Sequence, residues 1–329
     1  MKLFSRFAVG FMTLSIVAGA AGVALAQTHT FRFGHNNAVT HPVNLGAEQF
    51  AKRVKERTNG QVMIQVYPAA QLGDERQLGE ALQVGTVDMM WSSGPMLGRY
   101  VAPFNGLEGG YLFRDQEHLY KVVRGPIGQE LNEQLIKGIG VRVLDYHFAG
   151  ERHLTTTNKA VRTPADLKGM LIRVPQLDNY MATFKALGAS TVGIAFNETY
   201  MALKMGVAEG QENPISSIYA MKFHEVQKYI NLTSHIFATG IYSMNNKKFL
   251  ALPANFQAIL QEEAASAGAY ASSLYNKQAD ELVPELKKYM TFVEVDKVAF
   301  QKAAQAGGMD EWFVKQFGKE MYQRIKDTK

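Results

Sequence analysis

Segments with the character of strands alternate with amphipathic helices along the first third of the chain. Residues 30–33, 62–67 and 87–91 have the composition and polarity pattern of strands. Helices are expected to begin at Pro42 and at Asp74, where a glutamine three residues later completes a capping box. Strand–helix alternation is typical of α/β folds, in which ligand crevices lie at the carboxyl ends of the strands. The fold class predicted is therefore α/β.

A weak internal echo suggests two similarly wound lobes. Residues 81–85 (ALQVG) precede Asp88, and residues 202–206 (ALKMG) precede Glu209, so each copy is a helix end, a glycine and a short strand entering an acidic or polar loop. The pattern occurs twice and has no period of 20 to 50 residues, which argues against a solenoid.

The longest uninterrupted helical pattern covers Pro253 to Val283, broken only by Gly268. At about 1.5 Å per residue this helix would be roughly 45 Å long, which is enough to brace both lobes.

Several shorter expectations cover the rest of the chain. The sequence predicts a strand over 140–148 with a turn at Gly150, a short helix capped by Asn197, and a polar loop over 209–214. A last strand over 292–295 should precede one terminal helix. That helix carries aromatic residues expected to anchor the core: Trp312, Phe313 and Phe317.

The first 26 residues have the organisation of a secretory signal. Lys2 and Arg6 precede an apolar run over 7–26 that ends in the sequence Ala-Leu-Ala. An uncleaved membrane anchor is the alternative, although the second half of the run is rich in glycine and alanine and only weakly apolar. Cleavage near Ala26 would leave an exported, periplasmic chain of 303 residues, a length that suits two lobes.

Composition excludes several classes of function. The net charge is +5, or +3 without Lys2 and Arg6, and no basic run or basic–aromatic stripe indicates nucleic-acid binding. With no cysteine, the chain has no disulfides, thiolate metal sites or cysteine nucleophiles. His35 and His41 flank a loop without a carboxylate cluster, so hydrogen-bonding roles are favoured over a zinc site. We expect no cofactor and no metal.

Catalytic and nucleotide-binding motifs are also missing from the sequence. It has no G-x-S-x-G elbow and no G-x-x-x-x-G-K-[ST] phosphate loop. The nearest approach to H-E-x-x-H is His224-Glu225, which has Lys228 where the second histidine should be. The search favours a binding protein over an enzyme.

A single arginine stands in the apolar stretch LKGMLIRVPQ, residues 167–176. Residues 170–174 are expected to form a strand that Pro175 ends, which places Arg173 at the carboxyl end of that strand. A guanidinium there is suited to bind a planar anion through two parallel hydrogen bonds. A structural ion pair with a neighbouring Asp or Glu is an equally good explanation of the spacing alone.

The other polar groups at the mouths of predicted strands favour the anion. Two arginines could bind a carboxylate, asparagines and a serine could bind hydroxyl or carbonyl groups, and Phe196 could cover an apolar side. The strand-mouth set is Asn36, Ser93, Arg152, Arg173 and Asn213.

At these residues the chain resembles the extracytoplasmic solute receptors of TRAP transporters, a family that binds C4-dicarboxylates and sialic acid. The resemblance covers essentially the whole sequence after the signal. The motifs that carry it are Tyr67-Pro68 with 71–76 (QLGDER), 163–169 (TPADLKG) leading to 172–175 (IRVP), and 210–214 (GQENP) with 222–228 (KFHEVQK).

The resemblance implies a role for each matching residue. Arg173 would form a salt bridge with the substrate carboxylate and Asn213 would hydrogen-bond the same group, while Asn36, Phe196 and Arg152 would line the cleft. Glu75 and Gln176, which lie in and beside these motifs, complete the candidate ligand-binding set with Ser93.

The resemblance also implies a two-lobe periplasmic binding protein in which each lobe is discontinuous in sequence. Lobe I would take residues 27–150 and about 239–278, lobe II would take 151–238 and about 279–329, and the long helix would bridge both.

Two departures from the family pattern bear on the ligand. Sialic-acid receptors carry a glutamate after the third strand, where this chain has Ser93, so sialic acid is not favoured. The loop around residue 150 is one residue longer, so Arg152 and His153 compete for one equivalent place.

The expected function is that of a monomeric periplasmic receptor that closes on an organic acid and passes it to membrane permease subunits. One alternative is a sensor subunit that presents the bound acid to a membrane kinase. Another is an exported two-lobe enzyme, which would need a nucleophile or an acid–base pair in the cleft.

Overall fold

The computed structural model describes residues 28–329. The predicted signal segment, residues 1–26, lies outside the described residues. Within 28–329, no helix combines the length and the apolar character that a membrane crossing requires.

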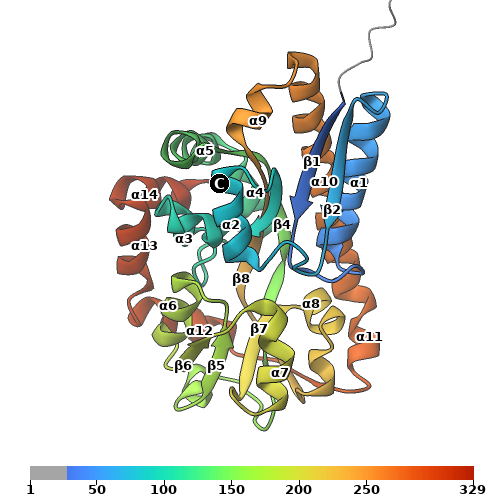
Figure 1. The fold of residues 1–329 in the computed structure, drawn as a ribbon. Helices are drawn as coiled ribbons and strands as arrows, with labels where there is room; N and C mark the ends of the chain where they lie inside the picture. Colours follow the sequence, from blue (N-terminus) through green and yellow to red (C-terminus); the bar gives the residue numbers. More distant parts are fainter. Residues whose placement is uncertain (1–27) are drawn as a thin grey trace, which may run out of the picture.

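One continuous mixed sheet runs through two lobes (Figure 1). Its strands follow the order β2-β1-β3-β8-β4-β7-β5-β6, with β9 added beside β8. Lobe I contains β1 to β3 and helices α1 to α5, and lobe II contains β5 to β7 and helices α6 to α8. The bounds of the lobe strands are His29–Gly34 (β1), Val62–Tyr67 (β2), Met89–Ser93 (β3), Leu171–Val174 (β5), Ser190–Gly193 (β6) and Gly210–Pro214 (β7).

Within each lobe these short strands are parallel to one another. β1 pairs with β2 and β3, and β5 pairs with β6 and β7, all in parallel. Residues that follow β1 and β3 in lobe I, and β5, β6 and β7 in lobe II, line one cleft between the lobes. The α/β prediction is confirmed. Asn36, Ser93, Arg173 and Asn213 lie at or just beyond strand ends, as predicted, whereas the predicted strand-end position of Arg152 is wrong because β4 continues to Thr156.

Two long antiparallel strands, β4 (Val141–Thr156) and β8 (Tyr229–Asn245), connect the lobes. β3 pairs with the second half of β8 in lobe I, and β7 pairs with the second half of β4 in lobe II. The expected turn at Gly150 is wrong, because the strand continues through it and the register shifts between Phe148 and Glu151. Gly150 has φ of +99°, and a Cβ there would lie 2.6 Å from the Pro214 side chain, so a larger residue would not fit.

Helices cover both faces of the sheet, and their starts follow the predicted signals. Pro42 is the first residue of α1, and the Asp74–Gln77 capping box is formed in full at the start of α2. The break at Gly125-Pro126 separates α4 from α5. The bounds are Pro42–Arg57 (α1), Glu75–Val84 (α2), Pro103–Gly106 (α3), Gln116–Val123 (α4), Pro126–Ile139 (α5), Asp178–Ala186 (α6), Thr199–Lys204 (α7) and Ile215–Ala220 (α8).

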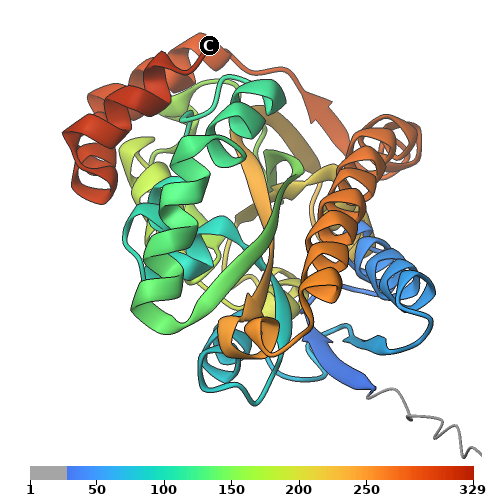
Figure 2. The same cartoon turned by 90° about the horizontal axis from the view of Figure 1, so that it is seen from above.

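Helix α10 (Ala254–Glu281) is the predicted long helix. It lies beside α1 in lobe I, follows β4, and reaches α8 in lobe II, as Figures 1 and 2 show. Its 28 residues correspond to about 42 Å. The prediction of a bridging helix is confirmed.

The C-terminal part differs from the expected single helix. After α9 (Asn246–Leu250), α10 and α11 (Val283–Leu286), strand β9 (Thr291–Val293) leads into three helices, α12 (Lys297–Ala306), α13 (Met309–Phe317) and α14 (Lys319–Asp327). Helix α13 contacts α3 of lobe I and α6 of lobe II. Phe313 and Phe317 are buried, as predicted, and Trp312 is partly buried. The predicted sequence boundaries of the two lobes stay a prediction.

Two other local expectations are wrong. Residues 210–214 form strand β7 and not a loop, because they are buried between β4 and β5. Asn197 lies inside a 3-10 turn, and the residue before α7 is Glu198, whose side chain makes no capping hydrogen bond.

Candidate ligand-binding cleft

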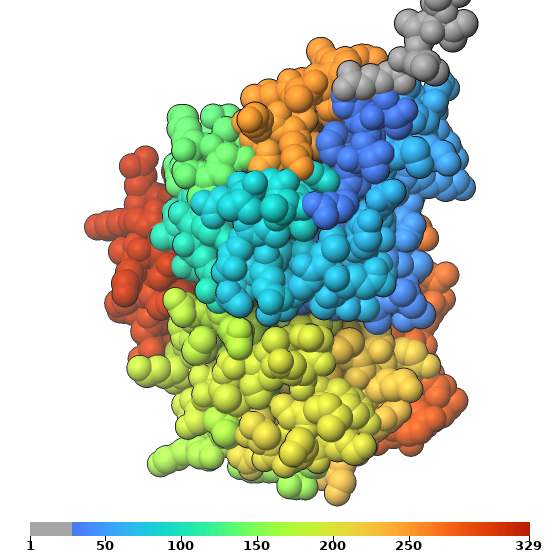
Figure 3. All heavy atoms as spheres, viewed as in Figure 1, coloured from blue at the N-terminus to red at the C-terminus, as the bar shows by residue number. Residues whose placement is uncertain are grey.

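The two lobes meet along a line where the cyan surface of lobe I adjoins the yellow-green surface of lobe II (Figure 3). A cleft of about 840 Å³, including the space at its open mouth, lies between them. All eight candidate residues line it: Asn36, Glu75 and Ser93 from lobe I, Arg152 from β4, and Arg173, Gln176, Phe196 and Asn213 from lobe II. The structure therefore brings the whole predicted set together.

Arg173 is fully buried on β5, at the lobe II wall of the cleft. Its Nε and Nη2 both donate to the carbonyl oxygen of Ile194, at 3.0 and 2.5 Å. Its Nη1 is buried and has no hydrogen-bond partner among residues 28–329. Among the same residues, no carboxylate lies within ion-pair distance of this guanidinium.

Burial lowers the pKa of Arg173 to about 10, and the charge of Glu212 opposes that shift. The guanidinium therefore keeps its charge at neutral pH. Burying a cation with an unused N–H group is costly, so this N–H is available to a ligand that can accept a hydrogen bond.

Arg152 lies close by and forms an ion pair with the protein through two of its three nitrogens. Its Nε and Nη2 donate to the two carboxylate oxygens of Glu212 at 2.6 and 2.8 Å, and Nη2 also reaches Oδ1 of Asn213 at 3.1 Å. Its guanidinium stacks over the ring of Tyr180, 4.9 Å from the centroid. The ion pair between Arg152 and Glu212 uses Nε and Nη2. The remaining nitrogen of Arg152, Nη1, has no protein partner among the described residues.

The pair is buried on both sides. Glu212 is fully buried and also contacts Nε2 of His235 at 3.2 Å. Burial opposes ionisation of Glu212, but Arg152 outweighs it and lowers the pKa of the carboxyl below its usual range. Burial also opposes the charge of Arg152, yet Glu212 raises the pKa of the guanidinium above its usual range. Both groups are ionised.

The competition between Arg152 and His153 is decided by the strand. Arg152 lines the cleft, whereas His153 does not, and its Nδ1 atom accepts a hydrogen bond from the backbone nitrogen of Ser234 on β8 at 3.3 Å. Consecutive side chains of a strand point to opposite faces, so only one of the two can face the ligand.

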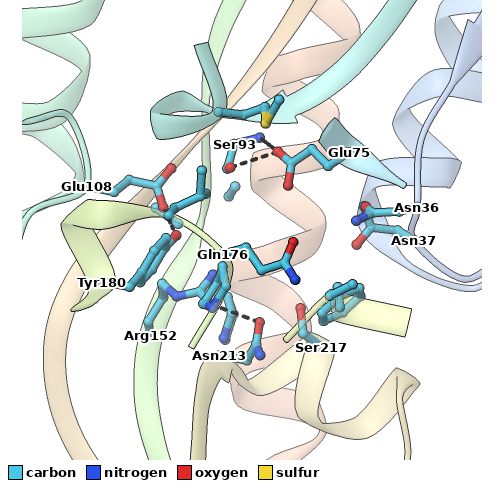
Figure 4. Close-up of a pocket in the computed structure, with 18 of the residues that line it drawn as sticks. Asn36, Asn37, Glu75, Ser93, Glu108, Arg152, Gln176, Tyr180, Asn213 and Ser217 are labelled. Atoms are coloured by element: carbon cyan, nitrogen blue, oxygen red, sulfur yellow. Dashed lines mark hydrogen bonds between the residues drawn. The ribbon is translucent and has the colours of Figure 1, made fainter. Parts of the chain in front are cut away.

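The lobe I wall is built around Glu75, the first residue of α2. Its Oε1 accepts two hydrogen bonds from Ser93, one from the backbone nitrogen at 2.6 Å and one from Oγ at 2.8 Å (Figure 4). Burial raises the pKa of Glu75, and the two Ser93 donors and the charge of Arg152 oppose that shift. Asn36 and Asn37 lie across from Glu75, joined by a side-chain hydrogen bond of 3.2 Å.

Sequence reasoning missed Glu108, which is buried at the back of the cleft. Its carboxylate accepts hydrogen bonds from the backbone nitrogens of Gly94 and Thr239 at 3.1 and 3.0 Å, and from the hydroxyl of Tyr180. Burial raises the pKa of Glu108 to about 7, against the opposing charge of Arg152. A lone carboxylate in a glycine-rich stretch, GLEGG over 106–110, was the available signal.

The two histidines have the hydrogen-bonding roles that were predicted. His35 contacts Asn44 at 3.2 Å. His41, at the N-terminus of α1, contacts Oγ of Ser217 on α8 at 2.9 Å and so joins the two lobes across the cleft. Burial lowers the pKa of His41 to about 3, so its imidazole is neutral. No group of metal-ligating side chains is found within 28–329.

Comparisons with known proteins agree with this architecture. The family described as bacterial extracellular solute-binding protein, family 7, matches residues 33–312. A solute-binding protein of Verminephrobacter eiseniae is 34% identical over 93% of this chain and 90% of its own length. The 2,3-diketo-L-gulonate-binding periplasmic protein of Escherichia coli is 31% identical over 87% of this chain and 88% of its own length.

Solved structures show the same fold. A TRAP periplasmic solute-binding protein of Roseobacter denitrificans with bound L-galactonate has a TM-score of 0.84 at 32% identity, covering 92% of this chain and 99% of that one. Another from Polaromonas with bound D-erythronate has a TM-score of 0.87 at 29% identity, covering 92% and 99%.

Proposed function

The chain belongs to family 7 of the bacterial extracellular solute-binding proteins and is a periplasmic TRAP-type receptor, and we propose that it grips the carboxylate of an organic acid through Arg173 for delivery to a membrane permease. Its relatives are ligand-binding transport receptors, so the alternative of an exported enzyme is not retained. The sensor alternative stays a prediction, as do the monomeric state and cleavage near Ala26.

One observation carries the proposal: the buried guanidinium of Arg173 has an unpartnered Nη1 and no ion pair among the described residues. Two of its nitrogens are fixed on Ile194, so the group is held in one orientation before any ligand arrives. A fixed, charged donor in a desolvated cleft binds a carboxylate strongly. The structural ion pair considered from the sequence would need a carboxylate partner for Arg173, and residues 28–329 supply none.

Closure of the two lobes around the ligand is the second part of the proposal. The cleft takes its lining from both lobes, and several hydrogen bonds already cross between them, among them the one from Tyr180 on α6 to Glu108. His41 meets Ser217 at 2.9 Å, and Arg99 donates to the backbone oxygen of Gln176 at 3.0 Å. The bulged strands β4 and β8 are the segments that would bend. Small-angle scattering should show a smaller radius of gyration with saturating ligand, and an unchanged radius would contradict closure.

The binding test begins with a thermal-shift screen over organic acids. A ligand present at 100 times its Kd stabilises the folded protein by about 2.7 kcal/mol, which is easily measured. Calorimetry with the best ligand should then compare wild type with Arg173→Ala and Arg173→Lys. Loss of one partner of a buried charge pair costs about 2 to 5 kcal/mol, so Arg173→Ala should weaken binding roughly 30-fold to several thousand-fold.

Arg173→Lys should recover little of this affinity, because an ammonium keeps the charge but loses the planar arrangement of donors. Arg142→Ala is the matched control, since Arg142 also lies on a strand, pairs with Asn246 and is not in the cleft. Affinity of folded Arg173→Ala within threefold of wild type would contradict the proposal.

A further inference from the structure

Among residues 28–329, the cleft offers one buried cation that has no ion pair. Four arginines line it, but Arg152 is neutralised by Glu212, and Arg76 pairs with Glu80 at 2.7 Å on the exposed face of α2. Arg99 stands at the exposed rim and donates to the Gln176 backbone. Only Arg173 is buried without an ion pair among residues 28–329. The inner cleft can therefore compensate one ligand carboxylate.

The opposite wall has the wrong charge for a second carboxylate. Asp74, Glu75 and Glu108 are the acidic residues that line the cleft. Asp74 is occupied as the cap of α2, where Oδ1 accepts from the Gln77 nitrogen at 2.8 Å, and Glu108 is held by three donors. Like charges in a site shielded from water repel strongly, so a second carboxylate placed near Glu75 would be disfavoured.

Glu75 is held ready to accept hydrogen bonds. Both bonds from Ser93 go to Oε1, which fixes the carboxylate at the start of α2. No residue within 28–329 donates to Oε2, and Glu75 is only partly buried, so that oxygen is open to the cleft. A carboxylate oxygen can only accept, so its ligand partner must carry a proton, as a hydroxyl group does.

The side chains near Glu75 are also suited to ligand hydroxyl groups. Asn36 and Asn37 use one hydrogen bond between their side chains, and the remaining amide groups can both donate and accept. The Gln176 side chain projects into the gap between the lobe I and lobe II walls (Figure 4). Neutral amides and one carboxylate acceptor match a chain of hydroxyl groups and do not match a second anion.

Building on the proposed function, we infer that this receptor selects polyhydroxylated monocarboxylates over dicarboxylates, with Arg173 holding the carboxylate and Glu75 accepting hydrogen bonds from hydroxyl groups at the far end. Arg173 sets the requirement for an acid, and Glu75 sets which acid is accepted.

The test uses matched acids of equal carbon number. Gluconate, galactonate and mannonate carry one carboxylate, the corresponding aldarates carry a second in place of the terminal alcohol, and hexanoate lacks the hydroxyl groups. Calorimetry on the full mature chain should find the best aldonate binding at least tenfold more tightly than the best aldarate and than hexanoate.

Glu75→Gln keeps the size of the side chain and removes its charge. We expect it to weaken binding of the best aldonate by tenfold or more and to leave binding of the aldarates unchanged or tighter. The preference for aldonates over aldarates should therefore become smaller. Glu117→Gln is the matched control, because Glu117 is an exposed glutamate on α4 that pairs with Lys121 and does not line the cleft. It should bind every acid as wild type does.

The outcomes separate the inference from the proposed function. An aldarate or hexanoate that binds as tightly as the best aldonate, or a preference unchanged in folded Glu75→Gln, would overturn the inference while Arg173-dependent binding of acids still stood. Acid binding that is unaffected in Arg173→Ala, or no binding of any acid, would overturn the proposed function and the inference with it.

Discussion

The two walls of the cleft are built in different ways. The lobe II wall rests on strands, since Arg173 lies on β5, Asn213 on β7 and Arg152 on β4. The lobe I wall takes Asn36 from the segment after β1, Glu75 from the start of α2, and Ser93 from the last position of β3. The strand-borne wall is cationic and buried, and the other is amide-rich and acidic.

This difference separates two tasks. Strands fixed on both sides by hydrogen bonds hold a charged group in one position, which is what binding of the proposed ligand carboxylate would require. Loops and helix starts tolerate sequence change without disturbing the sheet, so they are suited to reading the variable end of a ligand. The same contrast exists within the cationic wall, where Arg152 is paired with the protein and Arg173 is left open.

The largest effect on stability should come from Arg152, the paired arginine. Arg152→Ala leaves Glu212 buried without its partner, so the free energy of unfolding should fall by about 3 to 5 kcal/mol. Chemical denaturation of the ligand-free protein measures this. Arg173→Ala should cost less stability, because it leaves no carboxylate unpaired.

A double replacement sharpens this comparison. Arg152→Met with Glu212→Leu removes both charges, and should recover most of the lost stability because neither group stays buried alone. Two results would contradict the assignment of Arg152 to the protein and Arg173 to the ligand. One is an Arg152→Ala variant at least as stable to unfolding as Arg173→Ala, and the other is a double variant no more stable than Arg152→Ala.

An intermediate effect on stability is expected at Glu108, which lies where the two walls of the cleft meet. Burial raises its pKa from 4.5 to about 7, so its proton is held more tightly in the folded state than in the unfolded chain. The resulting contribution to stability is complete below pH 4.5 and is lost as the pH rises through about 7. At about 1.4 kcal/mol per pH unit it amounts to roughly 3 kcal/mol.

Glu108→Gln removes this titration. Wild type should therefore lose stability relative to Glu108→Gln between pH 4.5 and about 7, and the difference should be flat above that range. Urea denaturation at a series of pH values gives the result. A difference that stays constant across the whole series would show that Glu108 titrates at its ordinary pKa, as a fully hydrated carboxyl does.

The smallest effect is expected at the contact between lobes. Ser217→Ala removes the partner of the buried His41 imidazole, a contact between the lobes that would stabilise the proposed closed arrangement. One neutral hydrogen bond contributes about 1 kcal/mol, so ligand affinity should fall roughly fivefold. Calorimetry measures this change, with Ser273→Ala on the exposed face of α10 as the control. Equal affinity in the two variants would remove His41 and Ser217 from the closing mechanism.

The cleft residues were predictable where one residue type stands out from its local sequence. Arg173 is a charge in an apolar strand that a proline ends, and Asp74 with Gln77 has the spacing of a capping box. Such signals are local, so the sequence carries them. That Nη1 of Arg173 has no partner is instead a property of the tertiary structure. The other nitrogens of Arg173 bind the carbonyl of Ile194, which follows a different strand, β6.

Long-range features were not predictable. Strand β8, the longest in the described sheet, was not recognised, because the apolar–polar alternation at its start, residues 230–233, does not continue through the rest of 229–245. Its polar groups are satisfied by tertiary partners, as when Asn231 accepts from the Val161 nitrogen at 2.7 Å. Glu108 was missed for the same reason, since one of its donors, Thr239, is 131 residues away.

The central claim is that Arg173 meets the ligand's carboxylate, and a thermodynamic cycle tests it most directly. Calorimetry would measure wild type and Arg173→Ala, each with the tightest acid found in the screen and with the primary amide of that acid. The amide keeps the shape of the acid and removes its charge. The account predicts a coupling energy of about 2 to 5 kcal/mol between Arg173 and the carboxylate. A coupling near zero, with the acid and its amide weakened equally in Arg173→Ala, would contradict it.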